Sequence, residues 1–399
     1  MEPIKIVDNI YWVGAVDYDI RDFHGYLTPK GSSYNAYLII DDKITLIDTV
    51  KHGFEEELLS RVAKIVDPTK IDQVVSNHAE MDHSGGLPEI LKTIGIEKPV
   101  YASKLGVQAL GAQFQNAGLN LQAVGEKLSV GQQDLHFVET RMIHWPDSMF
   151  SFLPGPGILF SQDGFGFHLA STQRFDDELD EHFWGPLAIN YFANILTLYT
   201  APISKILEKA VSSGLLGQTK IICPDHGLIW RKDPGRIVAL YQEWVQQKPK
   251  NKAVIVFDTM WHSTEFMARE LTDALASLGV EAKYQSLKNV HRSQAVTECY
   301  EAAAIVVGSP TINNQMYPSV ADFLQYAKGL KFQNKIGASF GSYGWSGEAP
   351  KLIQAELATM GYALPSPEIR YRWVPLEKDL GPIRDLAKTL AEAIKKAVG

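Results

Sequence analysis

Cysteine is scarce in this chain of 399 residues: only Cys223 and Cys299 occur, and they form no C-x-x-C motif. This scarcity excludes a disulfide framework, an iron–sulfur cluster and a zinc site built from four cysteines. Long apolar runs are also missing, since AAAIVVG (302–308) has the length of a buried strand and not of a membrane span. The opening MEPIKIVDNI lacks the apolar core of a signal peptide. We therefore expect a cytoplasmic protein that does not enter a membrane.

Clusters of basic residues are absent as well. Lys and Arg number 38 against 46 Asp and Glu, which gives a net charge of −8 spread thinly along the chain. Because phosphate binding needs clustered Lys and Arg, we expect no nucleic-acid partner. Hydrophobic residues make up 45% and charged residues 21%, as in globular proteins, and the length predicts two or three domains.

Histidine usage divides the chain. Nine of the eleven histidines precede residue 250, where the polar stretch QQKPKNK (246–252) leads into a fresh apolar run, AVIVF. Such a change of composition beside a polar segment indicates a domain boundary. We predict one domain over residues 1–249 and a second over residues 250–399.

Both halves alternate short β-rich runs with helical patterns. In the first, YNAYLII (34–40) and ITLIDTV (44–50) predict a hairpin, followed by a helix over 54–66, a strand over 71–77 and a long helical stretch over about 186–213. This mixture indicates a layered α/β domain. In the second half, strands and helices alternate regularly, which predicts a doubly wound parallel sheet that binds ligands in the loops after its strands.

The strongest chemical signal is His78-Ala-Glu80-Met-Asp82-His83, directly after the strand-like IDQVVSN. In extended backbone, alternate residues project to the same side, so His78, Glu80 and Asp82 are expected to converge. Four ligand-type residues within six positions indicate a metal site. Further ligands must come from other loops that follow apolar runs, and the candidates are His144, Asp163 and His226. The other histidines, at 52, 136, 168, 182, 262 and 291, lack this context and are not expected to bind metal.

The pattern H-x-E-x-D-H, followed by a His, an Asp and a final His, resembles the diiron variant of the metallo-β-lactamase fold, an αββα sandwich. Hydrolytic members usually carry His where this chain has Glu80, and a carboxylate is a harder donor that favours iron over zinc. His83 matches the motif, but some members leave this position to water. The resemblance implies two irons, one bound by His78, Glu80 and His144, the other by Asp82 and His226, with Asp163 as the bridge.

Three loops of the second half are expected to bind a flavin. The first, after AVIVF, lacks the nucleotide-binding motifs G-x-x-x-x-G-K-[ST] and G-x-G-x-x-G but offers hydroxyls and backbone N–H groups to one phosphate at a helix N-terminus. The other two add amides and the rings of Tyr343 and Trp345 to flank a flat heterocycle. The trio resembles the FMN-binding loops of flavodoxin. The expected FMN contacts are Thr259, Met260, Trp261, His262, Ser263, Thr264, Pro310, Thr311, Ile312, Asn313, Asn314, Ser342, Tyr343, Gly344, Trp345, Ser346 and Gly347.

With both motif sets in order, nearly the whole chain resembles a flavodiiron protein (A-type flavoprotein). The resemblance implies an oxidoreductase in which electrons pass from a reduced donor through FMN to a non-haem diiron site that reduces O₂ to water, NO to N₂O, or both. It also implies a head-to-tail homodimer or a dimer of dimers. No Cys-rich rubredoxin module follows the second half, so the expected donor is a separate rubredoxin or a reduced coenzyme. His24 and Tyr26 resemble family residues near the substrate pocket.

Two other functions remain open at this stage. The first is a dizinc hydrolase with a fused regulatory flavodoxin, because a fold does not fix a function. The second is a plain electron carrier. Glu80 and the iron-like ligand set argue against the hydrolase, and the metal motif itself argues against the carrier. The sequence leaves open whether O₂ or NO is preferred.

Overall fold

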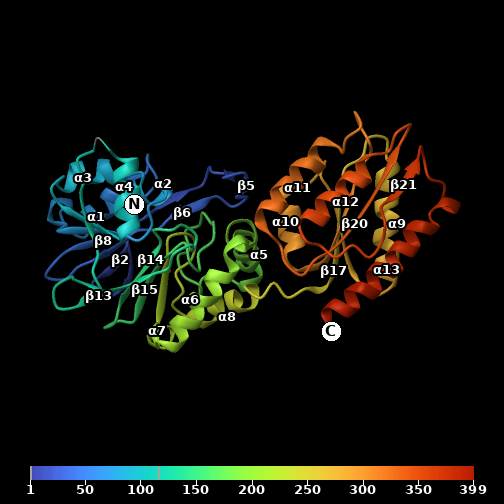
Figure 1. Cartoon of the computed structure of the whole chain (residues 1–399). Coiled ribbons are helices and arrows are strands. Elements are labelled where there is room, and N and C mark those ends of the chain that lie inside the picture. Colours follow the sequence, from blue (N-terminus) through green and yellow to red (C-terminus); the bar gives the residue numbers. More distant parts are fainter. Residues whose placement is uncertain (1, 116) are drawn as a thin grey trace. The chain divides into compact units, whose positions relative to one another are not determined.

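The computed structural model describes residues 2–115 and 117–399, which form two compact units (Figure 1). The N-terminal unit comprises Met1–Phe23, Thr28–Tyr191 and Tyr199–Val245. The C-terminal unit comprises Gln246–Gly399 together with two short segments from earlier in the chain, His24–Leu27 and Phe192–Leu198. The main change of unit thus falls between Val245 and Gln246.

Two mixed sheets form the centre of the N-terminal unit. The larger has the order β1(Ile4–Val7)-β2(Ile10–Trp12)-β7(Tyr37–Ile39)-β8(Thr45–Ile47)-β9(Gln73–Ser76)-β10(Pro99–Ala102)-β11(Asn120–Ala123). The smaller has the order β12(Lys127–Ser129)-β13(Asp134–Glu139)-β14(Met149–Leu153)-β15(Ile158–Gln162)-β16(Ile221–Pro224). β7 and β8 pair antiparallel with Tyr37 opposite Ile47, so the predicted hairpin is confirmed.

The two sheets pack face to face because their strands are apolar on the facing sides. Tyr37, Ile47 and Val75 from the larger sheet share one buried cluster with Met149 and Phe160 from the smaller. The opposite face of the larger sheet is covered by α1(Glu55–Ala63), α3(Leu87–Ile94) and α4(Lys104–Gln113), whose apolar residues join a second cluster. On the smaller sheet, the Tyr241 hydroxyl of α8(Pro234–Trp244) accepts a hydrogen bond from the Phe165 N–H beyond β15. The unit therefore has helices outside two packed sheets.

The long helix expected over about 186–213 is interrupted. The chain forms α5(Glu181–Tyr191), a π-helical turn over Phe192–Leu196, a 3₁₀ turn over Thr197–Tyr199 and α6(Thr200–Ser212). Pro202 has no amide hydrogen to bond the carbonyl of Leu198, so regular hydrogen bonding cannot continue through this point. Phe192–Leu198, the irregular part, is also the segment that belongs to the C-terminal unit.

The C-terminal unit contains a single parallel sheet of order β18(Glu281–Ser286)-β17(Lys250–Phe257)-β19(Ala302–Gly308)-β20(Ile336–Tyr343)-β21(Ile369–Arg372). One face packs against α9(Ser263–Ser277) and α13(Gly381–Val398), with Phe257, Leu271 and Leu390 in the shared core. The remaining helices are α10(Arg292–Glu301), α11(Pro318–Leu330) and α12(Ala349–Thr359). The parallel pairing confirms the predicted doubly wound sheet.

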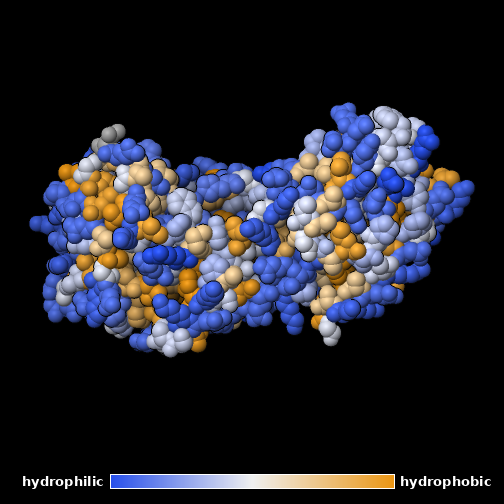
Figure 2. Space-filling model, viewed as in Figure 1, coloured by the Kyte–Doolittle hydropathy of each residue, from blue (hydrophilic) through white to orange (hydrophobic). Residues whose placement is uncertain are grey.

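The surface is mixed. On the face shown in Figure 2, hydrophobic residues are interspersed with hydrophilic ones. Across residues 2–115 and 117–399, no helix combines the length and the apolar character that crossing a membrane requires.

Candidate metal and flavin sites

All seven predicted metal ligands lie in loops or turns that follow strands of the N-terminal unit. His78 and Glu80 follow β9, and Asp82 and His83 lie in the short helical turn α2(Met81–Ser84). His144 lies between β13 and β14, Asp163 directly follows β15, and His226 follows β16. Strand ends of both sheets thus bring together residues separated by up to 148 positions along the chain (226 − 78).

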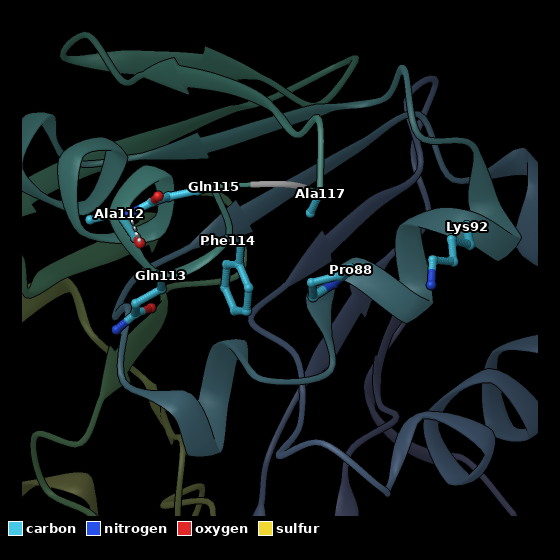
Figure 3. A pocket seen from close by; sticks show the side chains of 7 residues that line it. All are labelled: Pro88, Lys92, Ala112, Gln113, Phe114, Gln115 and Ala117. Atoms are coloured by element: carbon cyan, nitrogen blue, oxygen red, sulfur yellow. Dashed lines mark hydrogen bonds between the residues drawn. The ribbon is translucent and has the colours of Figure 1, made fainter.

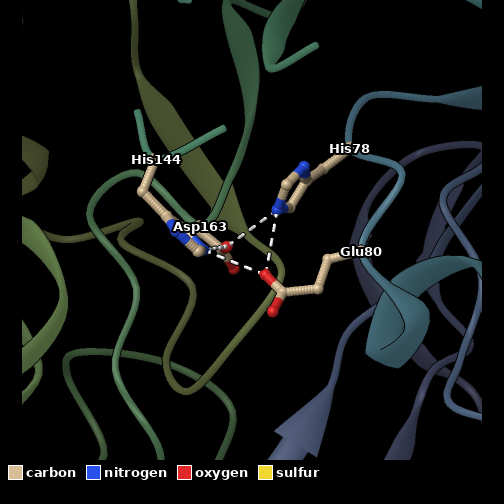
Figure 4. A group of neighbouring side chains, drawn as sticks. All are labelled: His78, Glu80, His144 and Asp163. Carbon is tan, nitrogen blue, oxygen red and sulfur yellow. Dashed lines mark hydrogen bonds and ion pairs between the residues drawn. The ribbon is translucent and has the colours of Figure 1, made fainter. Parts of the chain in front are cut away.

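The seven side chains form two adjacent groups. His78, Glu80, His144 and Asp163 form the first, whose side chains point toward one another in Figure 4. Asp82, His83 and His226 form the second. Within each group, one potential ligand atom per residue lies within 4.8 Å of every other. Two groups of this size suit two metal ions.

Asp163 lies between the two groups. Its Oδ2 is 3.1 Å from His144 Nε2 and 3.4 Å from His78 Nε2, both of the first group. Its Oδ1 is 3.1 Å from His83 Nε2 and 3.3 Å from His226 Nε2, both of the second. One carboxylate oxygen therefore faces each group, which is the arrangement that a bridging ligand needs.

The buried carboxylates of this site favour the protonated, positively charged form of the neighbouring histidines. Burial by itself lowers the pKa of His83, but Asp82, Asp163 and Asp225 outweigh it and raise the pKa to about 10. Burial likewise opposes protonation of His144, and hydrogen bonds to Asp163 and Glu80 raise its pKa to about 9. Bound cations would meet the same electrostatic demand.

Residues outside the two groups fix the orientation of the histidines. Asp147 Oδ2 accepts a hydrogen bond of 2.7 Å from the Ala79 N–H and lies 3.3 Å from His78 Nδ1. The carbonyl oxygen of Ser33 lies 2.7 Å from His226 Nδ1. Each contact engages Nδ1 and leaves Nε2 facing the site, as metal-binding histidines require.

One of the sequence-based arguments needs correction. Asp82 was expected to converge with His78 and Glu80 through extended backbone, but it lies in the helical turn α2, because the chain turns after Glu80 toward the helix α3. His168, which was not expected to bind metal, belongs to neither group. Its ring centroid lies 4.4 Å from that of His226, and Ser32 Oγ lies 2.7 Å from its Nδ1.

The donor set fits two iron ions. It contains only imidazole nitrogens and carboxylate oxygens, which suit iron. All seven side chains are nearly inaccessible to solvent, the most exposed being His144 at 8%. Both oxygens of Asp82 are buried and accept no hydrogen bond from the part of the chain that the structure describes. Asp82 Oδ2 lies 3.4 Å from His83 Nε2 and 3.2 Å from His226 Nε2, and a bound cation among these atoms would compensate the buried charge of the carboxylate.

A second site lies at the carboxyl end of the C-terminal sheet. A cavity of about 320 Å³ is lined by nine of the predicted flavin contacts, namely Met260, Trp261, Ser263, Pro310, Thr311, Ser342, Tyr343, Gly344 and Trp345. The lining also includes Trp373 and Val374, which follow β21 and were not predicted. Their only sequence signal is the exposed apolar run WV after a strand.

The other predicted flavin contacts surround this cavity without lining it. Thr264 Oγ1 lies 3.1 Å from Ser342 Oγ, which joins the first and third loops. His262 Nδ1 lies 2.7 Å from Glu265 Oε2 on the surface. The buried hydroxyl of Thr259 has no hydrogen-bond partner among the described residues, so it is available to a phosphate. The remaining residues of this set are Ile312, Asn313, Asn314, Ser346 and Gly347.

The cavity fits FMN. The N-terminus of α9, a helix of 15 residues, begins at Ser263, where backbone N–H groups can receive one phosphate. Tyr343, Trp345 and Trp373 supply aromatic surface for a flat ring system.

The two residues expected near the substrate pocket belong to the C-terminal unit by their contacts. His24 is exposed and Tyr26 is buried. The ring of Phe23, in the same hairpin, has its centroid 4.6 Å from that of His168 and 6.3 Å from that of His226, a predicted metal ligand. The placement of His24 and Tyr26 at the substrate pocket stays a prediction.

A further pocket is drawn in Figure 3. Its lining residues are Pro88, Lys92, Ala112, Gln113, Phe114, Gln115 and Ala117. Lys92 is its single charged residue and pairs with Glu89 at the surface. This lining contains no set of groups for catalysis or metal binding.

Comparison with known proteins agrees with both sites. Residues 33–227 match the family described as ODP family beta lactamase, and residues 255–395 match the flavodoxin family. The chain is 43% identical to the rubredoxin-oxygen oxidoreductase of Megalodesulfovibrio gigas over 99% of both chains. It is 42% identical to the nitric oxide reductase of Moorella thermoacetica over 98% of this chain and 99% of the relative. The crystal structure of the flavodiiron protein from Giardia intestinalis is 34% identical, with a TM-score of 0.94 over 100% of this chain and 99% of that one.

These matches confirm the predicted fold class, a metallo-β-lactamase-like domain followed by a flavodoxin-like domain. The cofactors of such a protein are FMN and two irons. The chain belongs to the flavodiiron protein family of oxidoreductases.

Proposed function

We propose that this protein takes electrons from an external donor into FMN and passes them to a diiron site that reduces O₂, NO or both. The supporting observation is the position of Asp163, whose two oxygens face two separate groups of histidines and carboxylates. A hydrolase would need only a metal that acts as a Lewis acid. This chain combines a donor set of the type that binds iron with a second domain whose cavity fits a flavin. The names of its relatives, an oxygen oxidoreductase and a nitric oxide reductase, point to the same two gases.

The two groups of proposed ligands correspond to the two metals. His78, Glu80 and His144 would hold one ion and Asp82, His83 and His226 the other, and Asp163 directs one carboxylate oxygen to each group. His83 belongs to this set because its Nε2 points toward Asp163 and Asp82 at 3.1 and 3.4 Å. When bound, the irons would supply binding and reduction of the gas, and FMN would supply the electrons.

The chain's own residues hold and insulate this site. Asp147 and the Ser33 carbonyl engage Nδ1 of His78 and of His226, which leaves the Nε2 atoms free to face the metal groups. The rings of Phe23, Tyr191 and Trp145 surround the histidines, at centroid distances of 4.6 Å to His168, 5.2 Å to His168 and 5.2 Å to His78 respectively. These rings and the burial of the seven proposed ligand residues limit the access of bulk water to the site.

The remaining assignments are proposals of the same kind. Residues 1–249 form the diiron domain and residues 250–399 the FMN domain. The electron donor is a rubredoxin, as in the name of the Megalodesulfovibrio gigas relative, or a reduced coenzyme. His24 and Tyr26 act at the substrate pocket, the protein works in the cytoplasm, and its active form is a head-to-tail homodimer or a dimer of dimers.

Metal and flavin analysis of the purified protein, combined with gas consumption, tests this proposal. We expect about two irons and one noncovalent FMN per chain, and consumption of O₂ or NO with a reduced donor. Asp163→Asn removes the negative charge between the two groups, so iron content and turnover should both fall. Asp134→Asn, at a half-buried position on β13 outside both groups, is the matched control. Two zincs per chain with hydrolysis and no gas consumption would refute the proposed function.

A further inference from the structure

The loop that follows β16, residues 224–227, contributes two side chains to the surroundings of the second metal group. It carries His226, a proposed ligand of that group. It also carries Asp225, whose Oδ2 lies 3.5 Å from Nδ1 of His83, another proposed ligand of the same group. Both side chains are buried. A contact that fixes the backbone of this loop therefore acts on the second group.

A single buried residue, Asn35, binds three of the four backbone carbonyls of this loop. Its Nδ2 donates hydrogen bonds of 2.8 Å to the carbonyl oxygen of Pro224 and of 3.2 Å to that of Gly227. Its backbone N–H donates to the carbonyl oxygen of Asp225 at 2.7 Å. Asn35 directly follows β6(Ser32–Tyr34), so the beginning of the chain holds a loop that lies almost two hundred positions later.

Ser33, two residues before Asn35, contacts the imidazole of His226 itself. Its carbonyl oxygen lies 2.7 Å from His226 Nδ1, and its Oγ accepts a hydrogen bond of 2.9 Å from the Gly227 N–H. These contacts require that the loop and the strand β6 stay in register. The hydrogen bonds of Asn35 fix that register, so they indirectly orient the His226 ring.

The indole of Trp12 determines which way the Asn35 amide points. Its Nε1–H donates a hydrogen bond of 2.9 Å to Asn35 Oδ1. Because an indole N–H only donates and the loop carbonyls only accept, one orientation of the amide satisfies all three partners. The Trp12 ring is itself held by Arg61 and Arg174, whose guanidinium carbons each lie 4.8 Å from its centroid, and all three side chains are buried.

We propose that Asn35, oriented by Trp12, is a positioning residue for one of the two metals, the one held by the second group. It acts through the backbone of residues 224–227 and so sets the position of His226. The first group is carried by the loops after β9, β13 and β15, which lie outside this loop. Loss of the Asn35 amide should therefore weaken the binding of one metal and spare the other. This inference rests on the proposed diiron function.

The test compares Asn35→Ala and Trp12→Phe in the full-length protein loaded with iron and FMN. Trp12→Phe keeps an aromatic ring but removes the N–H that orients the amide, so it tests the same role even if Asn35→Ala does not fold. Gln73→Ala is the matched control, because Gln73 is also a buried amide of this unit, lies outside both metal groups, and donates to Thr45 Oγ1 and to the Ser129 carbonyl oxygen, each at 3.0 Å.

Three measurements separate a positioning role from a general contribution to stability. The first is the amount of iron retained during titration with a chelator. The second is the Mössbauer spectrum of the iron-loaded protein, which reports each iron separately. The third is amide hydrogen exchange in a peptide covering residues 222–229.

In Asn35→Ala we expect one iron to bind about tenfold more weakly while the other keeps its wild-type affinity. One of the two iron signals in the Mössbauer spectrum should change, and exchange in the peptide should become roughly tenfold faster. Trp12→Phe should show the same changes to a smaller degree, and Gln73→Ala should show none of them.

Equal weakening of both irons in Asn35→Ala would overturn the proposal, because the residue would then contribute only to stability. Iron retention and exchange like those of the wild type in either Asn35→Ala or Trp12→Phe would also overturn it. Failure of the proposed function would look different, since the wild-type protein itself would not bind two irons.

Discussion

Asp147 illustrates how a single carboxylate next to the proposed ligands governs metal affinity. It binds the backbone of Ala79 and faces Nδ1 of His78, so it sets both the loop and the imidazole orientation. We expect Asp147→Ala to lower iron affinity by roughly 10–100-fold, the usual effect of losing such a partner. Competition with a chelator measures the change, with Asp134→Ala, on β13 and outside both metal groups, as the control. Equal iron affinity in the two variants would show that Asp147 has no such role.

The buried amine of Lys335, in the C-terminal unit, should make the free energy of unfolding depend on pH. Its ammonium group is buried and donates to the carbonyls of Tyr300 and Ala302, at 2.5 and 2.7 Å. Burial lowers the pKa of Lys335 from 10.5 to about 8, which corresponds to roughly 3 kcal/mol. Between pH 8 and 10.5 the unfolded chain binds more protons than the folded one, so folding becomes more favourable as pH rises through this range.

The contribution of Lys335 is isolated by comparison with Lys335→Met. The difference in unfolding free energy between wild type and this variant should shift in favour of the wild type by up to about 3 kcal/mol from pH 8 to 10.5. Denaturant unfolding at several pH values measures it, and Lys351→Met, at an exposed site on α12, should show no shift. A pH-independent difference for Lys335→Met would mean that the amine titrates normally in the folded protein.

At the scale of elements, sequence patterns located the strands well where burial is complete. AVIVF and AAAIVVG became the central strands β17 and β19, because only a two-sided buried sheet accommodates continuous apolar runs. Apolar periodicity did not predict two features that are determined by local hydrogen bonding. The helical turn at Asp82 and the break before Pro202 depend on hydrogen bonds between neighbouring residues, which apolar periodicity does not record.

The loop after β21 is an element that the flavodoxin resemblance did not include, and it leads to a prediction about FMN. The Trp373 N–H donates to the Tyr343 carbonyl at 2.7 Å, and a Cβ on Gly344 would lie 3.0 Å from the Trp373 ring. The indole therefore forms a fourth wall of the cavity. Trp373→Ala should weaken FMN binding about fivefold, since an aromatic contact contributes about 1 kcal/mol.

Fluorescence titration of the flavin-free protein with FMN measures this effect. Phe266→Ala is the control, because Phe266 is exposed on α9 but does not line the cavity. If Trp373→Ala binds FMN as tightly as Phe266→Ala, the fourth wall does not contact the cofactor.

For the molecule as a whole, the sequence predicted the residues of both candidate sites but not that residues 24–27 and 192–198 belong to the C-terminal unit. The ligand types at 78, 80, 144, 163 and 226 follow strand-like runs, so their convergence could be inferred from chemistry and position. The attachment of residues 24–27 and 192–198 to α10 depends on contacts such as Arg292 to Gly25, which join residues 267 positions apart. No local pattern in either segment encodes that pairing, and only the folded structure displays it.

The exposed rim of the flavin cavity supports the proposed homodimer. Its rim carries Trp261, Trp345 and Trp373, whose exposed fractions are 84%, 82% and 60%. Large apolar side chains gathered around a cofactor site mark an interaction surface, and a head-to-tail pair would place each chain's flavin beside its partner's metals.

Mixing two inactive variants tests whether that surface pairs flavin and metals between chains. His78→Ala removes a proposed iron ligand, and Ser263→Glu places a negative charge where α9 would receive the FMN phosphate. In a hybrid dimer, one of the two flavin–iron pairs consists of an intact flavin domain from one chain and an intact metal domain from the other. Gas turnover should therefore recover to about a quarter of the wild-type value after equal mixing with free exchange, because half of the dimers are hybrids and each has one working pair of two. Variants that exchange subunits, as shown by mass spectrometry, and yet stay inactive would mean that electrons pass within a single chain.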